Sequence, residues 1–219
     1  MWHTNSDATC PITLSPPPRS TCNPKFISSA VLSVNPNESP LPRPIPESYW
    51  VLPGQFLAGE YPGTVYFPEL TRKRLDAFLA AGFDTFIDLT SPGEIQPYEP
   101  LLREQAAYYH LSVQYTRFPI GDFGLPQSAQ MTATLDAIEA ALSGKRKLYL
   151  HCYGGIGRTG TVVGCYLVRQ GLSGQQALDQ LAAWWKHVPK SNRYPHSPET
   201  VQQENFIREW HNHEQRIPS

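Results

Sequence analysis

Residues 148–160 read LYLHCYGGIGRTG and join an apolar strand to a glycine-rich turn that opens a helix. Cys152 and Arg158 lie on either side of five residues, three of which are glycine. A turn this small and this flexible can fold its backbone N–H groups around an anion. The stretch therefore predicts a phosphate-binding cradle with a nucleophile inside it.

The cradle also has the means to activate its nucleophile. A cysteine attacks only as its thiolate, and a helix that begins near Gly157 would point N–H groups and the positive end of its macrodipole at the sulfur. Arg158 adds a permanent cation whose planar fork can hold two phosphoryl oxygens. We expect Cys152 to be the nucleophile, and the phosphate to be bound by Tyr153, Gly154, Gly155, Ile156, Gly157 and Arg158.

Two polar residues flank this motif. His151 ends the strand and is expected to hydrogen-bond backbone carbonyls and so fix the shape of the turn, with electrostatic support of the thiolate as the alternative. Thr159 follows the arginine and is expected to donate its hydroxyl to the departing sulfur. A helix N-cap would present the same residue at this place.

The string from His151 to Thr159 resembles the signature of the cysteine-dependent protein phosphatases, His-Cys-x2-Gly-x2-Arg-Thr/Ser. It matches at every position, with Gly155 as the middle glycine. The resemblance covers roughly Trp50 to Trp210, and residues 49–63 are similar to bacterial members. It implies a small protein tyrosine or dual-specificity phosphatase, a hydrolase that works through a phosphocysteine intermediate without metal or cofactor.

The substrate class stays open within this resemblance. Phosphotyrosine in proteins is the leading candidate, with phosphoserine and phosphothreonine as further substrates. A phosphoinositide or inositol phosphate is the alternative, but residues 153–157 lack the lysines that often bind such polyanions. A thiol-based arsenate reductase is more remote, because no second cysteine is placed to resolve the first. A non-catalytic module that binds phosphoproteins is the alternative from another class.

A proton donor is needed as well, because protonation of the leaving oxygen is worth about 10²- to 10⁴-fold in rate. Residues 117–126 read RFPIGDFGLP and carry one carboxylate, Asp122. This segment resembles the Pro-Ile-Pro-Asp-x-x-x-Pro loop that supplies the acid in dual-specificity and kinase-associated phosphatases. Gly121 stands where the family usually has proline, so we expect a looser loop. A turn aspartate that bonds its own backbone is the alternative interpretation.

Other polar groups are weaker candidates. Asp88 ends an apolar segment and is expected to face the sheet end or cap a turn. Glu94 is expected to be solvent-exposed, although in related enzymes a carboxylate often orients the signature arginine. Lys190 and Arg193 are expected in a solvated loop, with contact to an acidic substrate as the alternative.

A further segment, SPETVQQ at residues 197–203, has the pattern of a helix start. Ser197 would be the N-cap and Pro198 the first helical residue. The segment is also similar to the family region whose glutamine helps to position the hydrolytic water. Gln203 would be that supporting residue.

The apolar periodicity predicts an α/β fold. Alternation of strands and helices implies a central, mostly parallel sheet of four to five strands, flanked by helices, with ligands at the carboxyl ends of the strands. Cys152 and Asp122 each follow a strand, so both are expected at that rim, independently of the motif. Strands are expected at 49–52, 55–59, 83–89, 113–118 and 147–151, and helices at 68–81, 99–110, 128–142, 157–170, 174–187 and 198–211.

The first 46 residues differ in composition from the rest. They are rich in Pro, Ser, Thr and Asn and lack apolar periodicity, which predicts a disordered or polyproline-like segment able to recruit other proteins. We expect residues 47–219 to form the phosphatase domain. His3, Cys10 and Cys22 lie in the segment and are not expected to bind a metal.

The whole chain carries a formal net charge of −1, which gives no general electrostatic case for nucleic acid or an anionic membrane. It shows neither a signal-peptide pattern nor an apolar run long enough to insert into a bilayer. We expect a cytoplasmic protein, where Cys152 would stay reduced.

Overall fold

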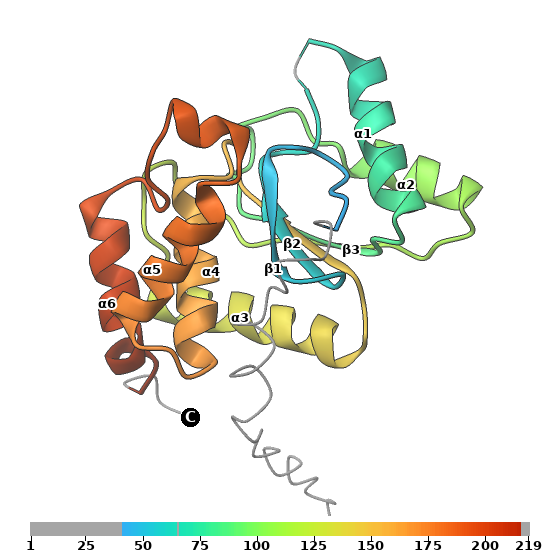
Figure 1. The fold of residues 1–219 in the computed structure, drawn as a ribbon. Coiled ribbons are helices and arrows are strands. Elements are labelled where there is room, and N and C mark those ends of the chain that lie inside the picture. Colours follow the sequence, from blue (N-terminus) through green and yellow to red (C-terminus); the bar gives the residue numbers. More distant parts are fainter. Residues whose placement is uncertain (1–40, 65, 216–219) are drawn as a thin grey trace, which may run out of the picture.

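A five-stranded sheet in the order β1-β2-β5-β3-β4 forms the centre of the computed structural model, which describes residues 41–64 and 66–215 (Figure 1). β1 pairs antiparallel with β2, and the other three pairings are parallel. This confirms the expected mostly parallel sheet. The strands are β1 (Ser48–Leu52), β2 (Phe56–Gly59), β3 (Thr85–Asp88), β4 (Gln114–Arg117) and β5 (Leu148–His151).

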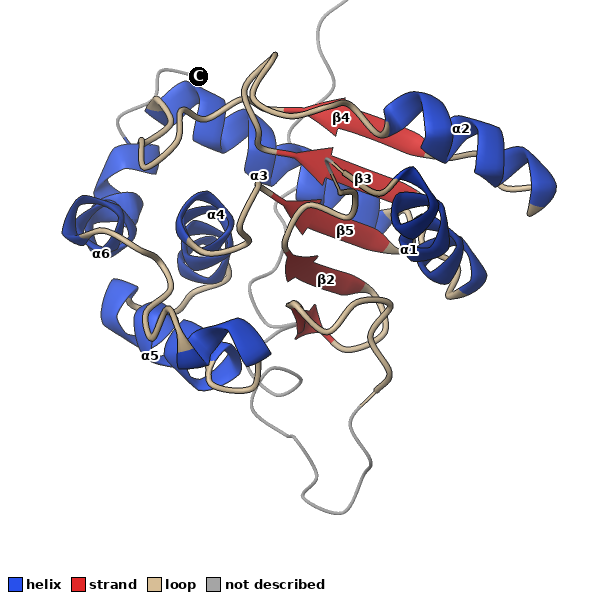
Figure 2. Cartoon of the chain, turned by 90° about the horizontal axis from the view of Figure 1, so that it is seen from above, coloured by secondary structure: helices blue, strands red, loops and turns tan. Residues whose placement is uncertain are grey.

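Helices cover both faces of the sheet, as Figure 2 shows. Two helices lie on one face over a cluster that includes Leu75, Phe78 and Leu102. Four lie on the other face, over a cluster that includes Met131 and Val163. The helices are α1 (Pro68–Ala80) and α2 (Glu99–Tyr108) on the first face, and α3 (Ser128–Ser143), α4 (Gly157–Arg169), α5 (Gly174–Trp185) and α6 (Val201–Gln215) on the second.

The expected elements all occur, and one helix start differs. α5 begins with the capping-box pattern of Ser173 and Gln176, whose side chains each bond the other's backbone. α6 begins at Val201, so the prediction of Ser197 as N-cap was wrong. The Ser197 hydroxyl instead donates to the Ile156 carbonyl at 2.9 Å. Thr200 takes the capping place, because its hydroxyl accepts the N–H of Gln203 at 3.2 Å.

The described residues begin inside the predicted N-terminal segment. Ile45 is buried against the α1 and α2 side of the sheet, and the Trp50 indole donates to the Leu41 carbonyl at 3.3 Å. Residues 41–46 therefore lie against the domain. The proline-rich stretch before them, with His3, Cys10 and Cys22, lies outside the described residues.

No helix within 41–64 and 66–215 is long and apolar enough to cross a membrane. The same residues hold no group of three or more His, Cys, Asp or Glu side chains that could bind a metal ion.

The sheet register gathers polar residues at the carboxyl rim. His151 at the end of β5 pairs with Gly59 of β2 on one side and with Asp88 of β3 on the other. Asp88 in turn pairs with Arg117 of β4. The cradle begins one residue beyond His151, so this rim is its floor.

Candidate active site

Residues 152–156 turn from β5 into α4 and enclose the sulfur of Cys152. The Gly155 N–H donates to Sγ at 3.2 Å. Gly155 has φ +74°, and a Cβ there would lie 2.5 Å from the backbone nitrogen of Glu60 and the carbonyl carbon of Gly59. Only glycine satisfies both the conformation and the space. Cys152 is covered from bulk solvent but lines a pocket of about 420 Å³.

The carbonyl groups of the turn are held from outside. The N–H and C=O groups of one trans peptide point in opposite directions. Carbonyl groups that point away from the pocket therefore leave the N–H groups of the same peptides facing it. A loop fixed in this way is ready to bind an anion without rearrangement. The carbonyl of Tyr153 accepts from the N–H of Tyr61 at 3.0 Å, that of Gly154 from Nζ of Lys190 at 2.9 Å, and that of Ile156 from the hydroxyl of Ser197 at 2.9 Å.

Arg158 lies in the first turn of α4 with its side chain buried. Its two terminal nitrogens contact Glu94 at 2.7 and 2.6 Å, and one of them also donates to the Ile120 carbonyl at 3.1 Å. Burial alone would lower the pKa of Arg158, but the hydrogen bonds that its guanidinium donates to Glu94 and the charges of Cys152 and Glu94 raise it. The guanidinium is therefore a fixed cation beside the sulfur.

Glu94 is the carboxylate that pairs with Arg158. The residue is exposed, as expected, but its side chain is only 21% exposed and turns inward to Arg158. Burial alone would raise its pKa, yet the hydrogen bonds from Arg158 and the N–H of Ser91 hold that pKa below the ordinary value. The alternative suggested by the family resemblance, a carboxylate that orients the arginine, describes this geometry.

Asp122 reaches the cradle through the same arginine. Its Oδ1 accepts from Nη2 of Arg158 at 3.0 Å, while the side chain remains 61% exposed. The loop closes on itself where Gly124 N–H donates to the Gly121 carbonyl at 2.8 Å. Asp122 lines the pocket together with Cys152. The structure thus brings the predicted nucleophile, arginine and acid to one place.

Gln203 is buried behind the cradle. Its Oε1 accepts from the N–H groups of Glu199 and Thr200 at 3.1 and 3.2 Å, which completes the capping box of α6. Its Nε2 donates to the Gly124 carbonyl at 3.3 Å and so ties the Asp122 loop to α6. The amide stands close to the pocket, since a Cβ at Gly157 would lie 2.9 Å from Oε1.

Glu199 is a pocket residue that sequence reasoning missed. It lines the same pocket as Cys152 and Asp122, and its Oε2 would lie 3.2 Å from a Cβ at Gly157. Burial and the charge of Asp122 raise the pKa of Glu199. Its position four residues before Gln203 could have indicated a place in the pocket. The sequence pattern of this segment, however, was interpreted as a helix start.

His151 and Asp88 form a buried layer beneath the cradle. His151 Nδ1 contacts the Cys152 carbonyl at 3.0 Å, and Nε2 contacts the Tyr98 hydroxyl at 2.8 Å. A carbonyl only accepts, so Nδ1 carries the hydrogen and Nε2 accepts from Tyr98. Burial lowers the pKa of His151, although the charge of Asp88 acts in the other direction. A neutral His151 therefore ties the Cys152 backbone to the core.

Asp88 both caps a turn and faces the end of the sheet, as expected. Its Oδ1 accepts from the N–H and hydroxyl of Thr90 at 2.8 and 2.7 Å, which caps the turn after β3. Its Oδ2 accepts from Arg117 at 2.9 Å and from the Tyr115 hydroxyl. Burial would raise its pKa, but the hydrogen bonds from Tyr115 and Thr90 hold the pKa below the ordinary value.

Thr159 is the third residue of α4 and is buried, so the N-cap alternative does not describe it. The N-cap position belongs to Ile156. The Thr159 hydroxyl donates to the Gly59 carbonyl at 3.4 Å, a long bond that leaves the hydroxyl able to change partner.

Basic residues line the edge of the pocket. Lys190 lies there with Arg193 and Tyr194. Its Nζ donates to Glu60 at 2.6 Å and to the Gly154 carbonyl at 2.9 Å. The expectation of a solvated Lys190 was therefore wrong, because this side chain supports the cradle from outside.

The chain is similar in sequence to known proteins over part of its length. Cyclin-dependent kinase inhibitor 3 of the pig (Sus scrofa) is 31% identical over 130 residues, 58% of this chain and 56% of that protein. A putative tyrosine phosphatase of invertebrate iridescent virus 3 is 35% identical over 91 residues, 40% of this chain and 35% of the viral protein. The chain thus spans only about half, or less, of the length of these relatives.

A solved structure shares the fold. The crystal structure of kinase associated phosphatase, with serine in place of its catalytic cysteine, has a TM-score of 0.60 at 22% identity. The alignment covers 74% of this chain and 89% of that one. The family model described as "Swiss Army Knife protein, DSP-PTPase phosphatase domain" matches residues 46–207, which is most of the chain. This chain therefore belongs to the DSP-PTPase family of phosphatase domains, within the dual-specificity phosphatase superfamily.

Proposed function

We propose that the chain is a cysteine-dependent phosphomonoesterase that hydrolyses phosphotyrosine in proteins through a phosphocysteine intermediate. One observation carries the proposal: the sulfur of Cys152 accepts an N–H of the cradle, while Arg158 beside it holds the carboxylate of Asp122. Nucleophile, anion-binding donors and a proton donor thus meet in one pocket.

In the first step the Cys152 thiolate attacks phosphorus, an S–P bond forms and the bond from phosphorus to the leaving oxygen breaks. Asp122 gives that oxygen its proton, which makes it a better leaving group. The cradle N–H groups and the fork of Arg158 hold the remaining oxygens and stabilise their charge in the transition state.

In the second step water attacks phosphorus, Asp122 takes a proton from the water, and the S–P bond breaks. The leaving thiolate is received by the Gly155 N–H and by the cation of Arg158. Inorganic phosphate is released and both side chains return to their starting protonation, so no external co-reactant is needed.

The walls of the pocket support an aromatic phosphate ester. Phe123 and Tyr153 line it and are among the exposed large side chains of the described residues. Their rings can flank a phenyl ring whose phosphate reaches down to Cys152. The cradle side chains from 153 to 157 are uncharged, which favours a single phosphate over a polyanionic inositol phosphate.

Hydrolysis of p-nitrophenyl phosphate by the purified chain tests the activity. We expect turnover that Cys152→Ser lowers to the background rate, because serine is a much poorer nucleophile at neutral pH. Cys165→Ser is the matched control, since Cys165 lies buried on α4 where burial raises its pKa well above the ordinary value. Activity that survives in Cys152→Ser would refute the mechanism.

A panel of substrates then tests which class of phosphate ester the enzyme prefers. Phosphotyrosine, phosphoserine and phosphothreonine peptides are compared with a soluble phosphoinositide at equal phosphate concentration. We expect the highest kcat/KM for phosphotyrosine. A higher value for the phosphoinositide would replace the protein substrate by a lipid headgroup.

A further inference from the structure

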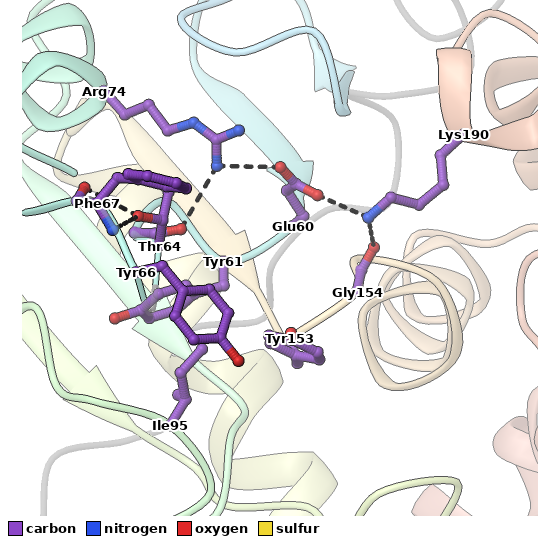
Figure 3. Close-up of a pocket in the computed structure, with 11 residues that line it drawn as sticks. Glu60, Tyr61, Thr64, Tyr66, Phe67, Arg74, Ile95, Tyr153, Gly154 and Lys190 are labelled. Carbon is purple, nitrogen blue, oxygen red and sulfur yellow. Dashed lines mark hydrogen bonds and ion pairs between the residues drawn. The ribbon is translucent and has the colours of Figure 1, made fainter. Parts of the chain in front are cut away.

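A second hollow of about 350 Å³ adjoins the active-site pocket and shares Tyr153, Gly154 and Lys190 with it (Figure 3). We call it the aromatic subsite. Figure 3 shows its rings gathered on one side and the charged side chains along the other. Its apolar walls are Tyr61, Tyr66, Phe67, Ile95 and Tyr153.

Three of these rings are unusually open to water. Tyr66 is 83% exposed, Phe67 65% and Tyr153 56%. Scattered exposed aromatics are common on protein surfaces, but a group of them around one hollow marks a place where a partner covers apolar surface. Because the hollow shares lining residues with the pocket of Cys152, one molecule can occupy both.

Hydrogen bonds tie the backbone of Phe67 to Thr64, and Thr64 to α1. The Thr64 hydroxyl oxygen accepts the N–H of Phe67 at 3.0 Å and donates to the Phe67 carbonyl at 2.9 Å. The N–H of Thr64 donates to the hydroxyl of Thr71 in α1 at 2.9 Å. Because the backbone of Phe67 is already held, less conformational entropy is lost there when a ligand binds.

The charged side chains of the subsite are paired with one another. The Glu60 carboxylate lies between Arg74 at 3.1 Å and Lys190 at 2.6 Å. These three side chains sum to one positive charge, and their carboxylate is already paired. Lysine and arginine side chains are therefore disfavoured as occupants, whereas an uncharged apolar side chain makes contact without displacing an ion pair.

We propose that the aromatic subsite binds an aromatic or large aliphatic side chain of the peptide substrate, one or two residues from the phosphorylated residue. The proposal rests on the proposed function, and it adds a sequence preference to it. An extended peptide advances about 3.3 Å per residue, so a neighbouring side chain can enter the subsite while the phosphate lies at Cys152.

The test uses phosphotyrosine peptides in an alanine background. One position at a time, from two residues before to two residues after the phosphotyrosine, carries phenylalanine, alanine or lysine. We expect phenylalanine at one position to raise kcat/KM about tenfold over alanine, which corresponds to about 1.4 kcal/mol, and lysine there to lower it. In the variant Tyr66→Ala/Phe67→Ala the phenylalanine-to-alanine ratio should fall to about one.

Tyr108→Ala is the matched control, because Tyr108 is 77% exposed but lines neither hollow. It should keep the wild-type ratio. Each ratio is internal to one protein, so a partial loss of folded enzyme does not affect it. Fluorescence anisotropy measures the binding of the same peptides to Cys152→Ser and so determines the preference in the absence of turnover.

The outcomes separate the subsite from the activity. Turnover without any positional preference, or a preference that survives in Tyr66→Ala/Phe67→Ala, overturns the aromatic subsite and leaves the phosphatase proposal standing. Binding that depends on Tyr66 and Phe67 without turnover supports the subsite and overturns the proposed activity.

Discussion

Arg158 and Glu94 form a two-point ion pair in which Nη1 lies 2.7 Å from Oε2 and Nη2 lies 2.6 Å from Oε1. Nη1 also donates to the Ile120 carbonyl, and Nη2 to Asp122. All four terminal hydrogens of the guanidinium thus have partners. A phosphoryl group that uses the fork of Nε and Nη2 needs the hydrogen that Asp122 accepts in this structure.

Glu94→Gln tests whether this pair positions the arginine. Glutamine keeps one acceptor oxygen but loses the charge and the two-point geometry, so the fork is no longer held in one plane. We expect kcat/KM on p-nitrophenyl phosphate to fall about 10- to 100-fold. Glu99→Gln is the control, because its pair with Arg103 lies at the surface, where such pairs contribute little. Equal activities in the two variants would contradict a positioning role.

The contact between Asp122 and Arg158 leads to a prediction about affinity. Asp122→Ala frees the Nη2 hydrogen and removes a negative charge from beside the bound anion. We expect inorganic phosphate to inhibit the variant at a roughly three- to tenfold lower concentration than the wild type. Competitive inhibition of residual p-nitrophenyl phosphate turnover measures this. An unchanged or higher inhibition constant would show that Asp122 does not compete for the arginine.

Asp122→Asn tests the role of proton donor. An amide cannot protonate the leaving oxygen, so kcat should fall about 10²- to 10⁴-fold on phenyl phosphate, a poor leaving group. The loss should be much smaller on p-nitrophenyl phosphate, whose leaving group needs little help. Glu199→Gln is the comparison, because Glu199 is another carboxyl in the same pocket. Leaving-group dependence in Glu199→Gln but not in Asp122→Asn would assign the acid to Glu199.

Two glycines with nearly the same positive φ separate the cost of backbone strain from the cost of a steric contact. Gly54 has φ +75° with open space around a Cβ, whereas Gly155 has φ +74° with backbone atoms of Gly59 and Glu60 at 2.5 Å. Gly54→Ala should cost about 1–2 kcal/mol of unfolding free energy from backbone strain alone and keep its activity. Gly155→Ala should cost more and abolish turnover, because the cradle must move off β2. Urea unfolding measures the stability of both variants, and hydrolysis of p-nitrophenyl phosphate measures their activity. Normal turnover in Gly155→Ala would contradict a rigid cradle.

The sequence predicted the parts of the site that are local in the chain. The strand, turn and helix around Cys152 follow one another directly, and Asp122 follows its own strand, so periodicity and strand polarity place them at the same rim. Contacts between segments that lie far apart in the sequence could not be predicted from it. Lys190 meets Glu60 across 130 residues, and Glu199 enters the pocket because Ser197 bonds the Ile156 carbonyl instead of capping a helix.

His151 should give the stability of the domain a pH dependence near neutrality. Burial lowers its pKa in the folded state, whereas in the unfolded chain it titrates at about 6.5. Below that pH the unfolded state binds the proton and the folded state does not, so the free energy of unfolding falls as the pH falls from 7.5 to 5.5. Asp88 and Glu94, whose pKa values are lowered from about 3.8 and 4.5, lose their stabilising effect only in more acidic solution.

Urea unfolding of the wild type and of His151→Asn at pH 7.5, 6.5 and 5.5 measures this effect. Asparagine does not titrate, and its side-chain amide can still donate toward the Cys152 carbonyl. The wild type should lose more stability than the variant over this range, and the difference between the two proteins isolates His151 from every other titrating group. Parallel pH profiles would mean that His151 takes up its proton equally in both states, which a neutral imidazole held between Tyr98 and the Cys152 carbonyl does not allow.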